Sequence, residues 1–227
     1  AVMNPELTYT LPDYQTQCGC TDIMMHTMER YFNMSENMEL TDGISEAIIK
    51  TVIKHSKILK EHPDCYESRA EVMWASSLSH NDLTGCGTDG GDWACHQLEH
   101  EIGGMFDVAH GAGLAAVWGS WARYVYKARP ERFAKFARNI FNIQETDDEK
   151  AAVAGIEAME NYYQSVGMPT SLCELGIHAT EEQIKEMADK CSFYGKRTVG
   201  VMKKIGAPEA AEIYRMANDK SIPLYSR

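Results

Sequence analysis

The sequence predicts an all-α fold. Apolar residues recur at the spacing of helix turns, as at Ile44, Ile48 and Val52. No stretch alternates apolar and polar residues as a half-buried strand would. Helix start signals agree with the spacing, because Thr180 and Gln183 form a capping box. With 227 residues, 44% of them hydrophobic, the chain is long enough for one large core, so we expect a single helical domain over residues 1–227.

Apolar periodicity predicts nine helices, with boundaries uncertain by a few residues. In the second of them, the lysines from Lys50 to Lys60 supply a solvated face. The predicted helices cover residues 13–33, 42–60, 67–80, 92–102, 110–126, 130–141, 147–165, 180–190 and 208–217.

Two turns between these helices have clear sequence signals. The helix from 147 follows Thr146, has an acidic first turn and closes at Gly167, and Pro169 prevents its continuation. The Gly-rich stretch 85–92 lacks the ending of a phosphate-binding loop, and no strand precedes it to form a dinucleotide-binding turn. We interpret it as a turn into a helix capped by Asp92.

The charge balance excludes two classes of partner. Against 33 Asp and Glu the chain has 22 Lys and Arg, a formal net charge of −11 that would repel a phosphate backbone and an anionic membrane surface. We therefore expect neither nucleic acid nor membrane as a partner. No apolar run is long enough to span a bilayer, and the first residues do not resemble a signal peptide.

The seven cysteines are scattered and odd in number, which does not fit a disulfide-stapled domain and favours a reducing, cytoplasmic location. Cys18 and Cys20 are only one residue apart, unlike common structural zinc motifs, and we interpret them as buried thiols. The chain begins with Ala1 and a loop-like segment, so we expect it to start within a longer natural protein.

Asp22 and His26 are the first candidate metal ligands. They are four residues apart, so a helix projects both from one face. Alone, such a pair is more often a solvated face or a local hydrogen bond.

A second cluster, of three histidines, makes a metal site the better interpretation. His96, His100 and His110 fall within 15 residues, flanked by Glu99, Glu101 and Asp107 as candidates to orient the imidazoles. Three imidazoles and one carboxylate suit zinc, ferrous iron, cobalt or nickel better than calcium or magnesium. Spacing alone leaves open whether His100 or His110 completes the ligand set.

Other residue patterns have structural interpretations. The stripe of Trp118, Trp121 and Tyr124 has helical spacing and is more typical of a core than of a cofactor site. The histidines outside the clusters are interpreted as ordinary surface or capping residues, namely His55, His62, His80 and His178.

Taken together and in order, these motifs resemble the iron-containing (group III) alcohol dehydrogenase family. The nearest subgroup is that of NAD(P)H-dependent butanol dehydrogenases and broad-range aldehyde reductases. The resemblance runs from about Tyr9 to the last helix. It rests on Tyr9-Thr10-Leu11-Pro12, Gly19, Asp22, His26, Glu29, Tyr31, Asp92-Trp93-Ala94, His96, His100, His110 and Gly111.

The resemblance implies one Fe(II), replaceable by Zn(II), held by Asp22, His26, His96 and His110. It also implies that His100 lies beside the nicotinamide and the substrate, as the candidate for proton transfer or positioning. The implied reaction is hydride transfer between NAD(P)H and a small alcohol or aldehyde, on the helical C-terminal domain of the dehydroquinate synthase-like fold.

The family also has an N-terminal α/β domain that binds the dinucleotide, and nothing in this chain resembles it. We therefore expect NAD(P)H to be bound by a domain outside this chain, the isolated chain to be inactive, and the full-length enzyme to be a homodimer.

Two other functions fit the same residues. A metal-dependent hydrolase on a helical scaffold would use the ion to activate water. A non-catalytic, metal-stabilised helical domain would close the ion off from solvent. Hydrolysis by the chain alone would favour the first, and four protein ligands with no exchangeable water would favour the second.

Overall fold

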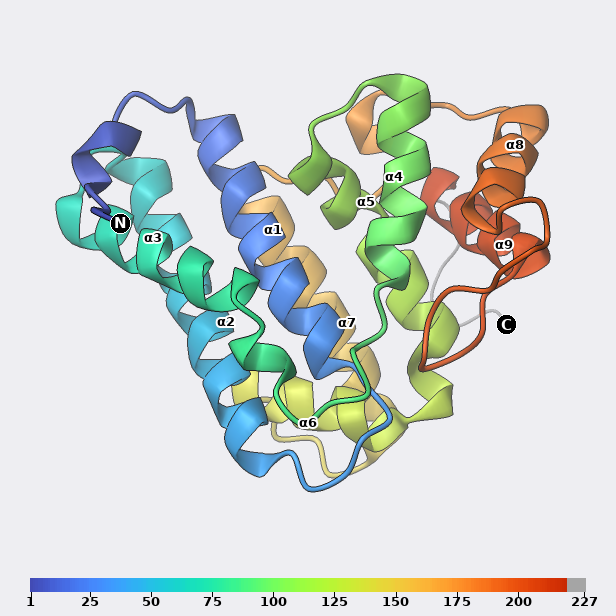
Figure 1. Ribbon diagram of the computed structural model, residues 1–227, viewed down its shortest axis with the longest axis horizontal. Coiled ribbons are helices and arrows are strands. Elements are labelled where there is room, and N and C mark those ends of the chain that lie inside the picture. Colours follow the sequence, from blue (N-terminus) through green and yellow to red (C-terminus); the bar gives the residue numbers. More distant parts are fainter. Residues whose placement is uncertain (220–227) are drawn as a thin grey trace.

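The computed structural model describes residues 1–219, and these form helices joined by short loops (Figure 1). No strand occurs in this range; the only sheet-like pairing is an isolated bridge between Val199 and Ile205. The predicted all-α class is confirmed. The α-helices are α1 (Asp13–Tyr31), α2 (Glu39–Glu61), α3 (Tyr66–His80), α4 (Ala94–Phe106), α5 (His110–Val125), α6 (Pro130–Phe141), α7 (Asp148–Ser165), α8 (Glu181–Cys191) and α9 (Ala207–Asn218).

Each predicted helix overlaps one of these, and four short 3-10 turns were not predicted. They are η1 (Pro5–Thr8), η2 (Leu83–Gly85), η3 (Tyr126–Ala128) and η4 (Cys173–Leu175). The capping box at Thr180 is present, with Gln183 returning a hydrogen bond to the cap. The prediction for Asp92 was wrong: the cap of α4 is Trp93, in the left-handed conformation.

The core is built around α5, whose residues from Gly111 to Ala122 are all buried. Trp118 and Trp121 lie inside, as the aromatic stripe predicted, while Tyr124 is only partly buried. In Figure 1, α1 lies between the α2–α3 pair and the central α4–α5 pair, with α6 and α7 below and behind. α8 and α9 pack against each other at the opposite end from α3.

A buried ion pair joins three of these helices. The Arg132 guanidinium of α6 donates to both carboxylate oxygens of Asp42 in α2 and to the backbone carbonyl of Tyr31 at the end of α1. A buried pair of this kind is costly to break, because removing one partner leaves an uncompensated charge. It therefore fixes the lower end of α1 against α2 and α6.

The predicted solvated face of α2 is present, since its lysines from Lys50 to Lys60 are exposed. Cys18 and Cys20 are buried free thiols, as predicted. Within the described residues, no helix is both long and apolar enough to cross a membrane.

Candidate metal centre

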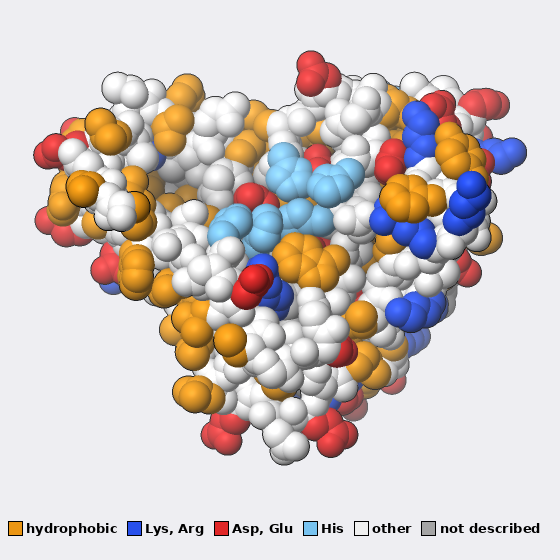
Figure 2. All heavy atoms as spheres, viewed as in Figure 1, with side chains coloured by type: hydrophobic (Ala, Val, Ile, Leu, Met, Phe, Trp, Pro, Cys, Tyr) orange, Lys and Arg blue, Asp and Glu red, His pale blue; other side chains and the backbone are white. Residues whose placement is uncertain are grey.

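Four helices contribute side chains to one cluster. α1 presents Asp22 and His26 from one face, α4 presents His96, and α5 begins at His110. His80, the last residue of α3, also lies there. Figure 2 shows the histidine side chains gathered at the middle of one face, where the left and right parts of the molecule meet.

Asp22, His96 and His110 form the inner group of this cluster. Oδ1 of Asp22 lies 3.4 Å from Nε2 of His96 and 3.6 Å from Nε2 of His110. These separations are long for a hydrogen bond. They suit two ligands of one ion, because ligands about 2.1 Å from a tetrahedral ion lie roughly 3.4 Å apart. The donor set therefore fits a divalent transition metal.

Two buried glutamates orient the inner imidazoles. Nδ1 of His96 hydrogen-bonds with Glu29, and Nδ1 of His110 with Glu99. The backbone N–H of His96 also donates to Glu29, at 3.1 Å. With Nδ1 protonated toward a carboxylate, Nε2 keeps the lone pair that a metal requires.

Two buried ligand atoms that lack a well-aligned hydrogen bond also indicate a metal site. Oδ1 of Asp22 and Nε2 of His96 are shielded from solvent and form no well-aligned hydrogen bond among residues 1–219, although Nδ1 of His26 lies 3.1 Å from Oδ1. Buried polar atoms without a partner are uncommon and need an explanation, such as an ion.

Charges in the cluster shift its pKa values. Burial opposes ionisation of Asp22, but the imidazoles of His26 and His96 outweigh it and hold the pKa of Asp22 well below its usual value. Burial likewise opposes protonation of His96, but Asp22 and Glu29 raise its pKa to about 9. The hydrogen bond with Glu99 raises the pKa of His110. Without a metal, the cluster retains protons where an ion would bind.

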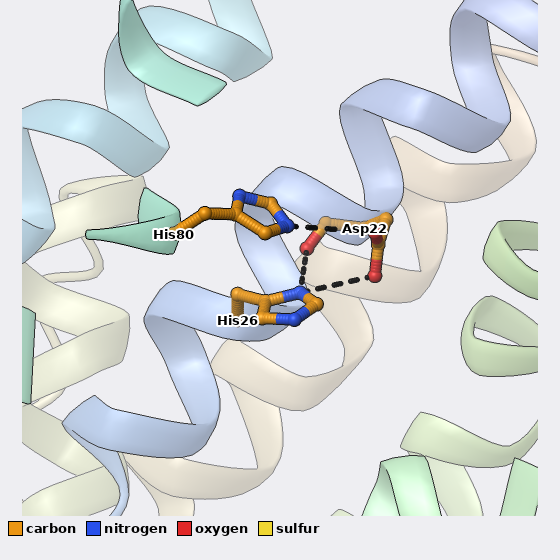
Figure 3. Close-up of side chains that lie close together, drawn as sticks. All are labelled: Asp22, His26 and His80. Atoms are coloured by element: carbon orange, nitrogen blue, oxygen red, sulfur yellow. Dashed lines mark hydrogen bonds and ion pairs between the residues drawn. The ribbon is translucent and has the colours of Figure 1, made fainter. Parts of the chain in front are cut away.

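His26 lies between the inner group and His80. Its ring centroid is 4.4 Å from that of His96 and 4.0 Å from that of His80. Its Nδ1 lies 3.1 Å from both the backbone carbonyl oxygen and Oδ1 of Asp22. His26, His80 and Asp22 each have a ligand atom within 4.8 Å of the others. Figure 3 shows these three side chains directed toward one another. His80 is exposed, as predicted for a surface histidine, but it also lies within this cluster beside Asp22.

His100 lies at the edge of the cluster. It is exposed, and its ring stacks on His110 with centroids 5.7 Å apart. Within the described residues, it shares a potential metal-binding group with Glu99 and His110 but not with Asp22.

Of the acidic residues flagged beside the histidines, only Glu99 binds one directly. Asp107 ends α4 in a left-handed conformation and is exposed, and Glu101 forms no hydrogen bond or ion pair with His96 or His110. From the sequence, Glu29 stands out only as part of the family motif. Its spacing could have indicated its role, since it lies seven residues after Asp22 and three after His26, on the same helix face.

Asp92 lies one residue before the N-cap position of α4 and also anchors the loop before α9. Its Oδ2 accepts hydrogen bonds from the backbone N–H groups of Val201 and Met202, each at 2.8 Å, and its Oδ1 accepts one from Ala94. Burial raises the pKa of Asp92 to about 6. The following residue, Trp93, turns its ring edge toward His26, with centroids 5.6 Å apart.

Gly111 allows α5 to approach α1 closely. A Cβ at this position would collide with the backbone carbonyl of Cys18. This contact sets His110 opposite Asp22, which is one turn beyond Cys18 on α1.

The model of the Fe-containing alcohol dehydrogenase family, C-terminal, matches residues 16–217. The chain belongs to the iron-containing alcohol dehydrogenase family. The sequence resemblance is thus confirmed at the level of the family and of its helical C-terminal fold.

Relatives with assigned activities are similar over nearly the whole chain. NADH-dependent butanol dehydrogenase A of Clostridium acetobutylicum is 37% identical over 217 residues, which are 95% of this chain and 55% of that protein. NADPH-dependent aldehyde reductase YqhD of Escherichia coli is 32% identical, over 96% of this chain and 55% of that protein. The chain thus spans about half the length of these curated relatives.

A solved structure shows the same arrangement of helices. The crystal structure of NADH-dependent butanol dehydrogenase A from Thermotoga maritima superposes with a TM-score of 0.89 at 35% identity. The match covers 95% of this chain and 55% of that one.

Proposed function

We propose that this chain supplies the metal centre of an NAD(P)H-dependent alcohol dehydrogenase or aldehyde reductase. The observation that carries the proposal is that two buried atoms, Oδ1 of Asp22 and Nε2 of His96, face each other at the separation of two metal ligands without a well-aligned hydrogen bond. The names of the butanol dehydrogenase and aldehyde reductase relatives support the reaction class.

Asp22, His26, His96 and His110 would hold one Fe(II), or Zn(II) in its place. Three neutral imidazoles and one carboxylate leave a divalent ion with net positive charge. Bound there, the ion supplies Lewis-acid stabilisation of negative charge on the substrate oxygen. The side chains of His110 and Asp22 are 40% and 27% exposed, so one side of the centre faces solvent. That opening favours a catalytic site over a closed structural one.

His100 is the candidate for proton transfer. It is exposed and stacks on His110, so it can exchange protons with solvent while facing the open side of the centre. An imidazole can both donate and accept a proton near neutral pH, which suits this role. In the reductive direction it would deliver a proton to the product oxygen, and in the oxidative direction it would accept one.

NAD(P)H and a small alcohol or aldehyde would meet on the exposed side of the histidine cluster. We propose that residues outside this chain bind most of the dinucleotide and that the complete enzyme is a homodimer. The first of these proposals is supported by the chain's spanning about half the length of its curated relatives.

The test combines metal analysis with turnover. The untagged chain is produced anaerobically with iron, and its metal content is compared with that of His96→Ala and His100→Ala. We expect about one ion per chain, lost in His96→Ala and retained in His100→Ala.

Turnover is measured on the chain fused behind the N-terminal half of the C. acetobutylicum enzyme. The fusion should reduce butanal with NADH or NADPH, and His100→Ala should lower the rate. Loss of metal in His100→Ala would contradict the ligand set.

A further inference from the structure

We propose that His80, His26 and Oδ2 of Asp22 form an outer subsite for a second divalent transition-metal ion, beside the inner group of Asp22, His96 and His110. This inference rests on the proposed metal centre and extends it. Asp22 would bridge the two ions, with one carboxylate oxygen directed to each.

The two oxygens of Asp22 face different histidines. Oδ1 lies 3.4 Å from Nε2 of His96, whereas Oδ2 lies 3.7 Å from Nε2 of His80 (Figure 3). The outer separation is again too long for a good hydrogen bond and close to that of two ligands sharing an ion. Carboxylates that bridge two ions in this way are found in centres whose metals are about 3.5–4 Å apart.

The tautomer of His80 favours metal binding. Its Nδ1 lies 2.7 Å from the Ser79 hydroxyl and 3.0 Å from the Ser76 carbonyl. The hydroxyl itself donates to that carbonyl, so both groups accept from Nδ1–H. The hydrogen is therefore on Nδ1, and the lone pair of Nε2 faces the Asp22 carboxylate. Two lone pairs directed at each other require a cation or a proton between them.

His26 supplies the third ligand of the outer subsite. One ring nitrogen of His26 lies within 4.8 Å of the ligand atoms of both His80 and Asp22. Because its ring is about as close to His96 as to His80, it can serve the inner ion when one metal is bound and the outer ion when two are bound.

Local charge permits a second cation. Asp22, Glu29 and Glu99 place three carboxylates around the cluster. A fixed positive charge lies close by on Arg30, which donates to the backbone carbonyls of His26 and Ser79. That charge is paired with Asp82, at 2.8 Å. The outer subsite should be the weaker one, because His80 is 40% exposed and its Nδ1 is held by neutral groups.

The experiment is a Co²⁺ titration of the untagged, metal-free, reduced chain, followed by absorption spectroscopy and equilibrium dialysis. Cobalt distinguishes histidine and carboxylate ligation from binding by the free cysteines, because thiolate ligands add charge-transfer bands. His80→Leu is compared with wild type and with His62→Leu, an exposed histidine on another part of the chain. Circular dichroism and thermal melting confirm that each variant is folded.

We expect about two ions per wild-type chain, bound in a tight and a weak step. His80→Leu should keep the tight step and weaken the other on the order of a hundredfold, whereas His62→Leu should change neither. A single step in wild type, or a second step unaffected by His80→Leu, would overturn the outer subsite and leave the inner centre intact. Absence of any bound ion would overturn the proposed function as well.

Discussion

The histidines on the two sides of Asp22 differ in the groups that hydrogen-bond to their Nδ1 atoms. On the inner side, His96 is nearly buried, and Glu29 and Glu99 hold Nδ1 of His96 and His110. On the outer side, exposed His80 rests on a serine hydroxyl and a backbone carbonyl. A carboxylate behind an imidazole makes it more basic and fixes its orientation. Ligand type alone should therefore not set the affinity of either side, and the carboxylates behind the inner imidazoles should make the inner side the first to bind.

The largest effect should come from Asp22, which both sides share. Asp22→Ala removes the bridging carboxylate and should abolish binding on both sides, whereas Asp22→Glu keeps a carboxylate and should retain part of it. Elemental analysis after dialysis measures the result. If Asp22→Ala kept about one tightly bound ion, the carboxylate would not be at the centre of the site.

Metal binding should strengthen steeply with pH. In the metal-free chain the pKa of His96 is about 9, above its ordinary value of 6.5, so its protonated form contributes stability that is fully present below pH 6.5 and is lost as pH rises through about 9. A metal displaces this proton. Apparent affinity should therefore rise about tenfold per pH unit between pH 7 and 9.

Thermal melting checks the same linkage. The increase in melting temperature caused by zinc should be larger at pH 8.5 than at pH 7, at equal free zinc. His62→Leu, which changes a histidine outside the cluster, should show the same pH dependence as wild type. A pH-independent increase would mean that zinc does not displace the proton of His96.

Removing the carboxylate that orients His96 should weaken metal binding only at the inner group. Glu29→Gln preserves shape but loses the negative charge behind His96, and should reduce inner affinity by about 10–100-fold. Competition with a chelator measures the loss. Glu101→Gln, on the same helix as His96 but without an ion pair to it, serves as the control. Equal losses in both variants would point to a general effect of net charge.

The smallest effect on metal binding should come from removing a hydrogen-bond partner of His80 in the outer subsite. Ser79→Ala removes the hydroxyl that accepts from His80 but leaves the Ser76 carbonyl in place. We expect the weak cobalt step to lose only a fewfold in affinity, about 0.5–1.5 kcal/mol for one neutral hydrogen bond, and the tight step to be unchanged. A larger loss than that caused by Glu29→Gln on the inner side would reverse the comparison.

The helices could be predicted because their apolar spacing and capping residues are local. α4 was an exception at its start: Asp92 had the residue type of a cap, but it pairs with the backbone of Val201 and Met202. That contact crosses more than 100 residues of sequence. Local signals could not reveal it, and the same holds for the left-handed conformation of Trp93.

The site could be predicted only where its residues share a helix or a known motif. Asp22 with His26, and His96 with Glu99, are each within one helix turn. The role of His80 depends on how the end of α3 packs against α1, and no spacing along the chain encodes that. The choice between His100 and His110 came from the family resemblance. The grouping of His110, and not His100, with Asp22 supports it.

Gly111 has a consequence for how this centre tolerates sequence change. The helices that carry Asp22 and His110 meet there backbone to backbone, so their separation does not depend on side chains that repack when the core mutates. The distance between these two proposed ligands should therefore stay the same when other core residues are substituted. Substitutions elsewhere in the core should therefore leave the opening between α1 and α5 unchanged, whereas at Gly111 even a methyl group would collide with the backbone of α1.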